Sequence, residues 1–329
     1  MERQERKIGN AWEKIRGYKE TTVLFIVVAL IILISIFKPI FLSGENIKTT
    51  AIGMSCDGII AIGMTIALIS GGFDLSVGAV MGLSAVITAM LAGLGVNLWI
   101  AAVIAMGIGT CVGLGSGLLI GKVGLNPFIT TLGMMSIARG AVFVLTGGTS
   151  LSITDTEGSF RFIGSGLIGG MFPTIVIIFL ALLAVGEFMV RRSAPVMKVF
   201  YVGSNEKAAK LSGINVAKVK IMVYMFTAIM ASLAGVLALA RFGAATANLG
   251  SGTEMSVISA GVIGGASLSG GEGSVIGTIL GVLLLSIINN ALVLFNVSVN
   301  WQNLISGAIL ILAVTLDLLS HRKKYSRAV

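Results

Sequence analysis

Long apolar stretches alternate with short polar ones along almost the whole chain. A bilayer core takes about 20 helical residues to cross, and nine stretches reach or approach that length: 21–37, 47–69, 75–92, 98–120, 127–146, 167–190, 221–240, 275–295 and 304–319. A tenth, 255–268, is shorter and rich in glycine, so we expect a tilted or broken helix lined by protein. The pattern predicts an all-α polytopic membrane bundle of about ten helices.

The composition is that of a membrane protein. The chain is 56% hydrophobic and 11% charged, whereas soluble domains carry charge on roughly a quarter of their residues. Its two cysteines, Cys56 and Cys111, lie inside predicted spans, and its single histidine, His321, lies in the basic C-terminal tail. Nothing here has the spacing of a disulfide framework or a metal site, and histidine-based catalysis is excluded. We therefore expect neither a metal nor a cofactor.

Lysine and arginine gather on one side of the predicted bundle. If the N-terminus is cytoplasmic, alternating spans place 18 of the 23 basic residues in the cytoplasm. The other five are Lys38, Lys48, Arg139, Arg161 and Arg241. Cytoplasmic loops are enriched in basic residues, so both termini are predicted to be cytoplasmic. The net charge of +9 then reflects topology and attraction to anionic membrane lipid, and nucleic acid is not an expected partner.

This topology divides the chain into three parts. Residues 1–20 form a charged cytoplasmic lead, 21–320 the transmembrane domain with a cytoplasmic loop at 191–220, and 321–329 a basic cytoplasmic tail. The lead is followed by no small-x-small cleavage site, so we do not expect a cleaved signal peptide. Its modest apolar stripe suits either an interfacial helix or a tail without fixed structure.

A polar, helix-forming segment, YVGSNEKAAKLSGIN (residues 201–215), separates two apolar stretches on the basic side. The loop and N-cap that open it are expected at Gly203, Ser204 and Asn205. Glu206 falls in the first turn, and Gly213 is expected to end the helix in a left-handed conformation. The surface of this helix is small and mildly apolar, and consists of Ala208, Ala209, Leu211 and Ser212. It suits docking on a partner, although this segment alone is equally consistent with a solvated helix.

Small residues recur at every fourth position through one predicted span. They are Ala105, Gly109, Gly113, Gly117 and Gly121. Such ridges let helix backbones approach closely inside a membrane. We therefore expect a role in helix packing, which also suits a bundle whose helices slide between states.

Two turns rich in glycine and serine resemble each other. GGFDLSVGAVMG (residues 71–82) and GGASLSGGEGSVIG (residues 264–277) both follow a predicted helix that runs inward to the cytoplasmic face. Repeats of the same orientation within one chain are a known transporter architecture. The similarity indicates a weak internal repeat.

Polar residues within or beside the spans are candidates for a transport path, because burying them costs free energy. The charged ones are Asp57, Asp74, Arg139, Glu187, Arg241, Glu254 and Asp317. Asn126 is expected to cap a helix that begins at Pro127. Asn289 and Asn290 need partners, and either join helices or line the path. The residues assigned to a translocation path or gate are Gly72, Asp74, Ser76, Asn126, Pro127, Phe128, Asn289 and Asn290.

No hydrolytic motif is present. The nearest approach to a phosphate-binding loop is SGLLIGKV at residues 116–123, which lacks both the first glycine and the final serine or threonine, and lies in a predicted span. The chain is therefore not expected to be an enzyme. If ATP energises it, another chain binds the nucleotide.

Four motifs occur together: GGFDLSVGAVMGLSA, GLNPFITTLGMMSIARG, GSNEKAAKLSGINV and GGASLSGGEGSVIGT. In combination they resemble the permease subunits of bacterial sugar-importing ABC transporters of the ribose, xylose, galactose and autoinducer-2 type, over residues 42–317. The resemblance implies a permease of the bacterial cytoplasmic membrane. Its implied partners are a cytoplasmic ATPase with two fused nucleotide-binding halves, an extracytoplasmic sugar-binding protein, and a second permease subunit, identical or different. Residues 203–213 would form the coupling helix that docks on the ATPase.

Three alternatives stay open. Permeases of the same architecture for branched-chain amino acids or nucleosides share this resemblance. A carrier driven by an ion gradient would need a carboxylate in the middle of the membrane, for which Asp57 is the one fair candidate. A membrane-embedded enzyme would need clustered nucleophile, base or metal-binding residues, and the sequence offers none.

Overall fold

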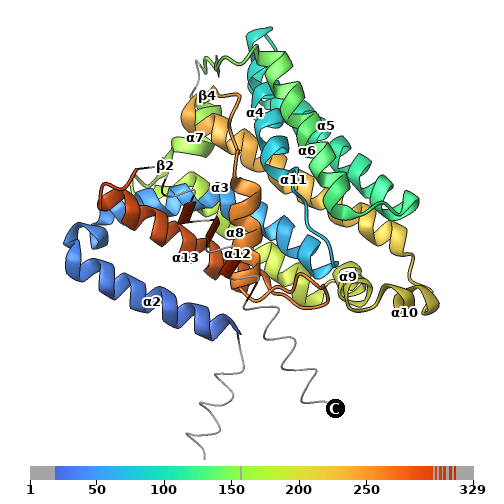
Figure 1. Ribbon diagram of the computed structural model, residues 1–329. Coiled ribbons are helices and arrows are strands. Elements are labelled where there is room, and N and C mark those ends of the chain that lie inside the picture. Colours follow the sequence, from blue (N-terminus) through green and yellow to red (C-terminus); the bar gives the residue numbers. More distant parts are fainter. Residues whose placement is uncertain are drawn as a thin grey trace, which may run out of the picture.

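The computed structural model describes residues 19–155 and 158–298, with single positions between 301 and 315. Its helices (Figure 1) are α2 (Lys19–Phe37), the 3₁₀ turn η1 (Pro39–Leu42), α3 (Gly44–Ile69), α4 (Val77–Gly93), α5 (Leu98–Leu118), the π-helical turn η2 (Leu119–Val123), α6 (Pro127–Thr146), α7 (Ser159–Ser165), α8 (Thr174–Arg192), α9 (Ala194–Ser204), α10 (Glu206–Leu211), α11 (Val216–Phe242), α12 (Thr253–Ile263) and α13 (Val275–Leu294). Within the described residues, seven helices are long and apolar enough to cross a membrane, and α4 and α12 are shorter apolar helices. The predicted all-α polytopic membrane bundle is confirmed.

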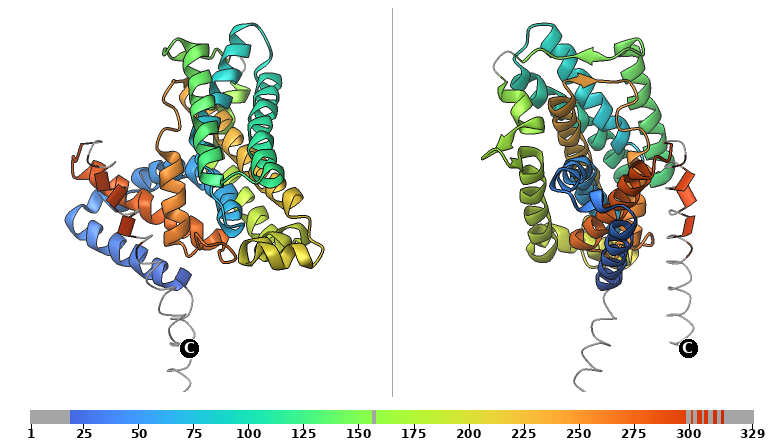
Figure 2. Two further views of the ribbon diagram at one scale, coloured as in Figure 1. Left: turned by 45° about the vertical axis from the view of Figure 1, so that its right-hand side comes forward. Right: turned by 90° about the vertical axis from the view of Figure 1, so that its left-hand side faces the viewer.

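The helices form two groups that lie side by side. Helices α4, α5 and α6 stand together in one group, and α2, α3 and α13 in the other (Figure 1 and the left view of Figure 2). The long helix α11 packs against α3, α4 and α5 and so joins the two groups.

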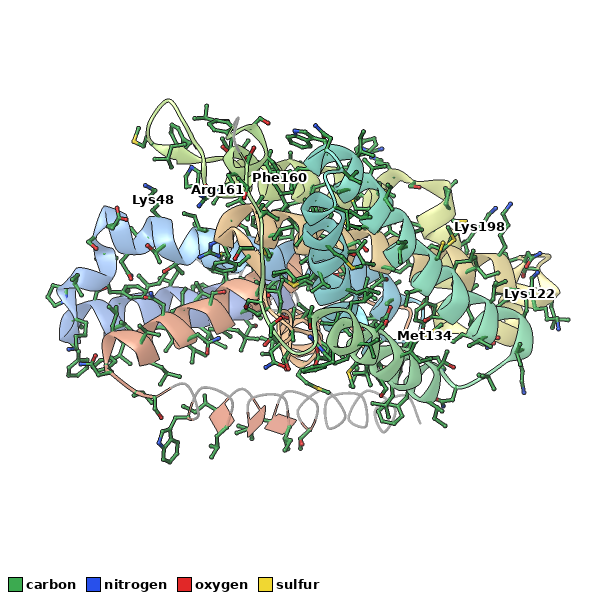
Figure 3. The ribbon with its side chains drawn as sticks, turned by 90° about the horizontal axis from the view of Figure 1, so that it is seen from above. Lys48, Lys122, Met134, Phe160, Arg161 and Lys198 are labelled. Atoms are coloured by element: carbon green, nitrogen blue, oxygen red, sulfur yellow. The ribbon has the colours of Figure 1, made fainter. Side chains whose placement is uncertain are left out.

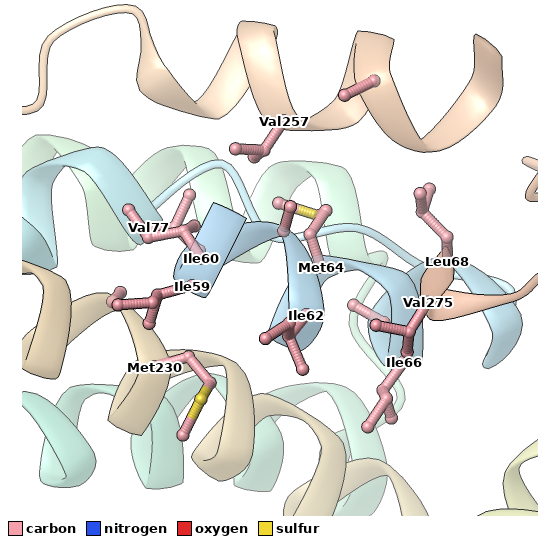
Figure 4. Packing of buried hydrophobic residues seen from close by; sticks show 14 of the residues in the cluster. Ile59, Ile60, Ile62, Met64, Ile66, Leu68, Val77, Met230, Val257 and Val275 are labelled. Atoms are coloured by element: carbon pink, nitrogen blue, oxygen red, sulfur yellow. The ribbon is translucent and has the colours of Figure 1, made fainter. Parts of the chain in front are cut away.

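Helix α3 is the centre of the bundle. Every residue from Ile59 to Ile69 is buried, and α8, α11, α12 and α13 all pack against this helix. Figure 4 shows α3 side chains between Val257 of α12 on one side and Met230 of α11 on the other. A helix that is apolar on all faces is stable only where neighbours cover every face, so the sequence of α3 requires this central place.

The ridge of small residues on α5 faces α11, as the sequence predicts. A Cβ atom added at Gly113 would lie 2.5 Å from the Cβ of Ala228, and one at Gly117 would lie 2.7 Å from the Cα of Ile221. The two helices can approach this closely only because the side chains between them are absent.

One predicted span begins later than expected. The sequence predicts a helix from residue 167, whereas Leu167–Ile168 (β2) and Phe172–Pro173 (β3) form a short antiparallel hairpin and α8 begins at Thr174. Gly169 and Gly170 turn the hairpin with φ of +62° and +73°, a conformation that glycine adopts at little cost. Because the strands of the hairpin are apolar, hydropathy alone does not distinguish them from the helix that follows.

The broken helix expected at 255–268 is the short helix α12. It is preceded by an irregular segment, residues 243–252, which we call the α11–α12 connector. The connector begins with strand β4 (Ala244–Ala245), which pairs antiparallel with β1 (Leu151–Ser152). The prediction of irregular backbone here is confirmed, although its main part lies before the helix.

Three sequence-based expectations fall on residues that are described only in small part or not at all. They are the cytoplasmic lead at 1–20, the span at 304–319 and the basic tail at 321–329. The number of ten spans therefore stays a prediction.

Basic residues mark two ends of the bundle. Figure 3 shows Lys122 and Lys198 on one side of the molecule, the side of α9 in Figure 1, and Lys48 and Arg161 on the opposite side. The charge bias assigns the first pair to the cytoplasm and the second to the exterior. The separation of the two pairs agrees with that assignment.

The two similar turns have the same capping geometry. After α3, the amide of Gly72 bonds to the carbonyl of Ala67 and that of Gly71 to Leu68; after α12, Ala266 bonds to Gly261 and Gly265 to Val262. Each is a Schellman motif that ends a helix with a left-handed glycine, at Gly71 and at Gly265. The caps match Gly71 with Gly265, whereas the similarity of the two sequences matches Gly71 with Gly264. The two alignments therefore differ by one residue.

The α5 ridge gives a test of the packing. Gly113→Leu and Gly117→Leu should lower the yield of folded protein in membranes, because overpacking a close contact costs typically 1–3 kcal/mol. Gly107→Leu on the same helix is the matched control, since a Cβ at Gly107 meets no atom within 4 Å. The measurement is the detergent-extracted monodisperse fraction and its melting temperature. Equal behaviour of all three variants would show that the ridge contributes nothing to stability.

Candidate functional site

Three segments that are far apart in sequence meet at the end of α3. They are the turn after α3 (residues 69–76), the end of α9 at residues 203–204, and the turn after α12 (residues 264–274). The amide of Gly271 donates a 2.8 Å hydrogen bond to the carbonyl oxygen of Ile69. A Cβ added at Gly203 would lie 1.8 Å from that same oxygen and 2.8 Å from the nitrogen of Gly271. We call this three-way contact the glycine junction.

Glycine is needed at the junction for conformation as well as for space. Gly71, Gly270 and Gly271 have φ of +79°, +83° and +78°, in the left-handed region that other residues avoid. A Cβ at Gly270 would lie 2.7 Å from the Cα of Gly71. Because no flexible side chain separates the three segments, a displacement of one must be transmitted to the others.

A pocket of about 240 Å³ opens beside the junction. Its wall includes Gly72, Pro127, Gly203, Asn205, Glu206 and Tyr224. The structure thus brings two residues assigned to the path, Gly72 and Pro127, together with three residues assigned to ATPase coupling. A Cβ at Gly72 would lie 2.5 Å from the hydroxyl of Tyr224, so the pocket has this depth only because residue 72 lacks a side chain.

Asp74 is the buried acid of the turn after α3, with 1% of its surface exposed. Its Oδ1 accepts hydrogen bonds from the backbone amide (2.8 Å) and the hydroxyl (2.6 Å) of Ser76. Burial raises the pKa of Asp74 to about 6, and the bonds from Ser76 oppose that rise. Its Oδ2 and the hydroxyl of Tyr224 are buried without a hydrogen-bond partner among the described residues. Such atoms are costly in a static fold.

The start of α6 is tied to the same turn. The side chain of Asn126 accepts a 2.9 Å hydrogen bond from the amide of Phe128, and Pro127 is the first helical residue, as the sequence predicts. The ring of Phe128 meets that of Phe73 edge to face, with 6.2 Å between centroids. The turn after α3 therefore contacts the start of α6.

The predicted coupling helix is α10, and α9 precedes it. Asn205 caps α10 by accepting a 3.0 Å bond from the amide of Ala208, and Gly213 ends it with φ of +80°; both agree with the sequence. The expectation of a loop at Gly203 and Ser204 is wrong, because both residues belong to α9. The helical backbone places Gly203 next to the carbonyl oxygen of Ile69, and glycine permits this contact because it has no side chain.

Helix α10 has one face packed on the bundle and one face exposed. Ala209 is buried, whereas Leu211 is 90% exposed. Glu206 pairs with Lys220 of α11, with 2.6 Å between the carboxylate oxygen and Nζ. Ala208 and Ser212 are exposed as well. A leucine exposed to this degree at the edge of a fixed helix is a suitable anchor for a partner.

Asn289 and Asn290 do not belong to this site. Asn290 exchanges two hydrogen bonds with Asn46, at 3.0 and 2.9 Å, and Asn46 lies at the opposite end of α3 from the junction. Asn290 therefore joins α13 to α3. Asn289 borders a separate cavity of about 20 Å³ together with Asp57 and Ser256.

Several residues of the site could not be selected from the sequence. Lys220, Tyr224, Gly270 and Gly271 reach it only through the packing of α11 and of the turn after α12. The similarity of the two glycine-rich turns was the one available signal, because a repeat often places its two copies together. In the described part of the chain, no three side chains of metal-binding type gather.

Known proteins resemble the chain along most of its length. A family model described as branched-chain amino acid transport system / permease component matches residues 46–314. The ribose import permease protein of Escherichia coli strain K12 is 35% identical over 300 residues, which is 91% of this chain and 93% of that protein. The ribose import permease protein of Bacillus subtilis strain 168 is 36% identical over 288 residues, 88% and 89% of the two chains.

A third relative carries a different sugar in its name. The galactose/methyl galactoside import permease protein of Escherichia coli strain K12 is 36% identical over 322 residues, 92% of this chain and 95% of that protein. No solved structure matches the chain significantly. These matches confirm the resemblance to sugar-import permease subunits that the motifs indicate. The chain belongs to the family of branched-chain amino acid transport system permease components.

Proposed function

We propose that this chain is the transmembrane permease of an ATP-driven importer that brings a monosaccharide into a bacterium. Relatives named as ribose and galactose import permeases cover most of the chain. The observation that carries the proposal is that α10, with its exposed face, directly follows the part of α9 that forms the glycine junction. Leu211 is exposed for a partner, while Gly203, three residues before α10, is in backbone contact with Ile69 and Gly271.

The geometry suggests how a motor protein would act on the bundle. A force applied at Leu211 passes along α10 to the end of α9, and from there to the turns after α3 and α12. The turn after α3 leads into α4 and meets α6 through Phe73 and Phe128. Closure of the ATPase would therefore shift α4, α6 and α13 together and switch the pathway between inward- and outward-facing states.

The proposal assigns the other tasks to partner chains. A cytoplasmic ATPase with two nucleotide-binding halves hydrolyses ATP, an extracytoplasmic binding protein selects the sugar, and a second permease subunit completes the pore. The permease then needs only a path that binds the sugar weakly, because the binding protein has selected the sugar before it reaches the permease. Both termini lie in the cytoplasm in this scheme.

An ion-driven carrier is the alternative with a residue to test. Asp57 shares with Ser256 and Asn289 a cavity of about 20 Å³, room for about one water molecule. Uptake by reconstituted permease in the absence of ATPase and ATP, abolished by Asp57→Asn, would favour the carrier. Uptake that follows a loaded amino acid-binding protein would favour a different cargo for the same architecture.

The proposed orientation can be read from labelling. A single cysteine at Ser150 should react with an impermeant thiol reagent from outside intact cells, while cysteines at Glu206 and Tyr325 should react only after permeabilisation. The physical reason is the bias of basic residues toward the cytoplasm. External labelling at Glu206 would overturn the assignment of α10 to the ATPase side.

Docking through α10 predicts loss of the partner without loss of the fold. Leu211→Glu should leave the permease at normal membrane levels, because the side chain is exposed, yet abolish co-purification of the ATPase. Leu94→Glu, at another exposed leucine (71%) on the turn after α4, is the matched control and should retain the ATPase. Full retention in Leu211→Glu would reduce α10 to a solvated helix.

A charge swap between Glu206 and Lys220 tests whether Glu206 contacts the ATPase or only holds α10 in place. Glu206→Lys should lower the binding-protein-stimulated ATPase rate, because it removes the pair with Lys220 and a favourable charge worth about 0.3–1 kcal/mol at a helix N-terminus. Adding Lys220→Glu restores an opposite-charge pair. Recovery in the double variant means that Glu206 positions α10; continued loss means that its carboxylate meets the ATPase.

The junction itself is tested by adding one methyl group. Gly203→Ala places a Cβ 1.8 Å from the Ile69 oxygen, so the segments must separate at a cost of about 1–3 kcal/mol. We expect the ATPase to remain bound but stimulation by the loaded binding protein to fall. Gly140→Ala in α6, where a Cβ meets no atom within 4 Å, should behave as wild type. Normal stimulation in Gly203→Ala would contradict transmission through the junction.

A further inference from the structure

The α11–α12 connector is an irregular stretch of backbone that runs along transmembrane helices. In Figure 1 it is the orange segment that descends from β4, near the top of the view, to α12 in the middle. Its residues 249 and 250 lie against α4, since a Cβ at Gly82 would be 2.7 Å from the Leu249 oxygen and one at Gly78 would be 2.1 Å from the Gly250 oxygen. The backbone of the connector therefore packs directly against α4.

The depth of the connector follows from its contact with α6. The guanidinium of Arg139 donates hydrogen bonds to the carbonyl oxygens of Ala247 (3.1 Å) and Leu249 (2.8 Å). Arg139 is twelve residues after Pro127, where α6 begins beside the pocket, and seven before its end at Thr146. At 1.5 Å per residue this places it about 18 Å from one end of the helix and about 10 Å from the other. The connector thus reaches the interior of the membrane, in the half away from α10.

Arg139 fixes the backbone of the connector. A charged residue within a span is costly unless it is paired or faces a polar environment, and here it satisfies carbonyl groups that no helix or sheet would satisfy. The carboxylate of Glu254, just beyond the connector, attracts Arg139 and accepts a 3.2 Å bond from the amide of Gly252. These contacts hold the connector as a rigid support.

The side chains of the connector alternate between buried and exposed. Ala245, Ala247 and Gly250 are buried, whereas Thr246, Asn248 and Ser251 are exposed. Within the described residues, the side chains of these three exposed positions have no hydrogen-bond partner. We call Thr246, Asn248 and Ser251 the polar strip.

Lipid cannot satisfy such a strip. Irregular backbone and unpaired polar groups occur at membrane depth only where protein or water surrounds them. Hydroxyl and amide groups both donate and accept hydrogen bonds, which matches the hydroxyls of a neutral sugar, whereas the strip holds no fixed charge for an amino acid zwitterion. We infer that the polar strip lines the aqueous path by which a neutral, polyhydroxylated solute crosses this permease, an inference that rests on the proposed function.

The first arm of the test measures water access without any transport. In a background of Cys56→Ala and Cys111→Ser, single cysteines replace Asn248 and, as the matched control, Ile137 of α6, which is apolar, 67% exposed and only two residues before Arg139, so that it lies at about the same depth. A charged, impermeant thiol reagent should modify Asn248→Cys at least about tenfold faster than Ile137→Cys, because only the thiolate reacts and hydrocarbon suppresses its formation. Equal slow rates at both positions would overturn the inference.

The second arm measures transport by the complete complex. Asn248→Trp should reduce the rate of sugar uptake severalfold at normal membrane level, and Asn248→Ser, which keeps a donor and an acceptor, should retain most of it. Ile137→Trp should transport as wild type. Normal uptake in Asn248→Trp would refute the assignment of the strip to the path.

The two arms separate this inference from the proposed function. If the wild-type complex with its ATPase and binding protein imports no sugar, the proposed function fails, while the labelling rates still decide whether water reaches the strip. If wild-type uptake is normal and Asn248→Cys is shielded, the function stands and the inference fails.

Discussion

The close contact between Gly203 and the carbonyl of Ile69 is the constraint on which the proposed coupling geometry depends. Inside a bilayer, no hydrophobic force distinguishes a neighbouring helix from lipid, so tight packing has to hold the bundle together. The same absence of side chains recurs between α5 and α11 and between α12 and α13, where a Cβ at Gly281 would lie 2.1 Å from the Ala260 oxygen. At these contacts the helices meet backbone to backbone, with no side chain between them that could adjust.

Rigidity of this kind determines what a motor protein can achieve. A soft contact would absorb a small displacement at α10 through side-chain rotation, whereas the glycine junction has no rotamers to change. Helices α3 and α12 both end with left-handed glycines, Gly71 and Gly265, and the similarity of the two caps means that one displacement reaches two equivalent helix ends. Beside these turns, Asp74 and Tyr224 each have a buried oxygen without a hydrogen-bond partner among the described residues.

Local chemistry was predictable, and contacts between distant segments were not. The caps at Asn126 and Asn205, the left-handed Gly213 and the α5 ridge follow from short-range rules of helix geometry and packing. The sequence does not predict the hairpin at β2 and β3, because the hairpin is apolar. It predicts a loop at Gly203, because the helical conformation of this residue depends on its contact with Ile69, over a hundred residues away. Lys220 and Tyr224 carry no sequence signal at all, since α11 brings them to the site.

In the path that we infer, the connector would keep a polar route open without binding the solute tightly. The guanidinium of Arg139 donates hydrogen bonds to the carbonyls of Ala247 and Leu249, so its positive charge holds the backbone of the connector beside the polar strip. What remains on the exposed side is a short series of neutral donors and acceptors, each of which exchanges hydrogen bonds with water at small net gain. A solute that moves along them therefore meets no deep minimum, which is the condition for fast release once selection has taken place on another chain.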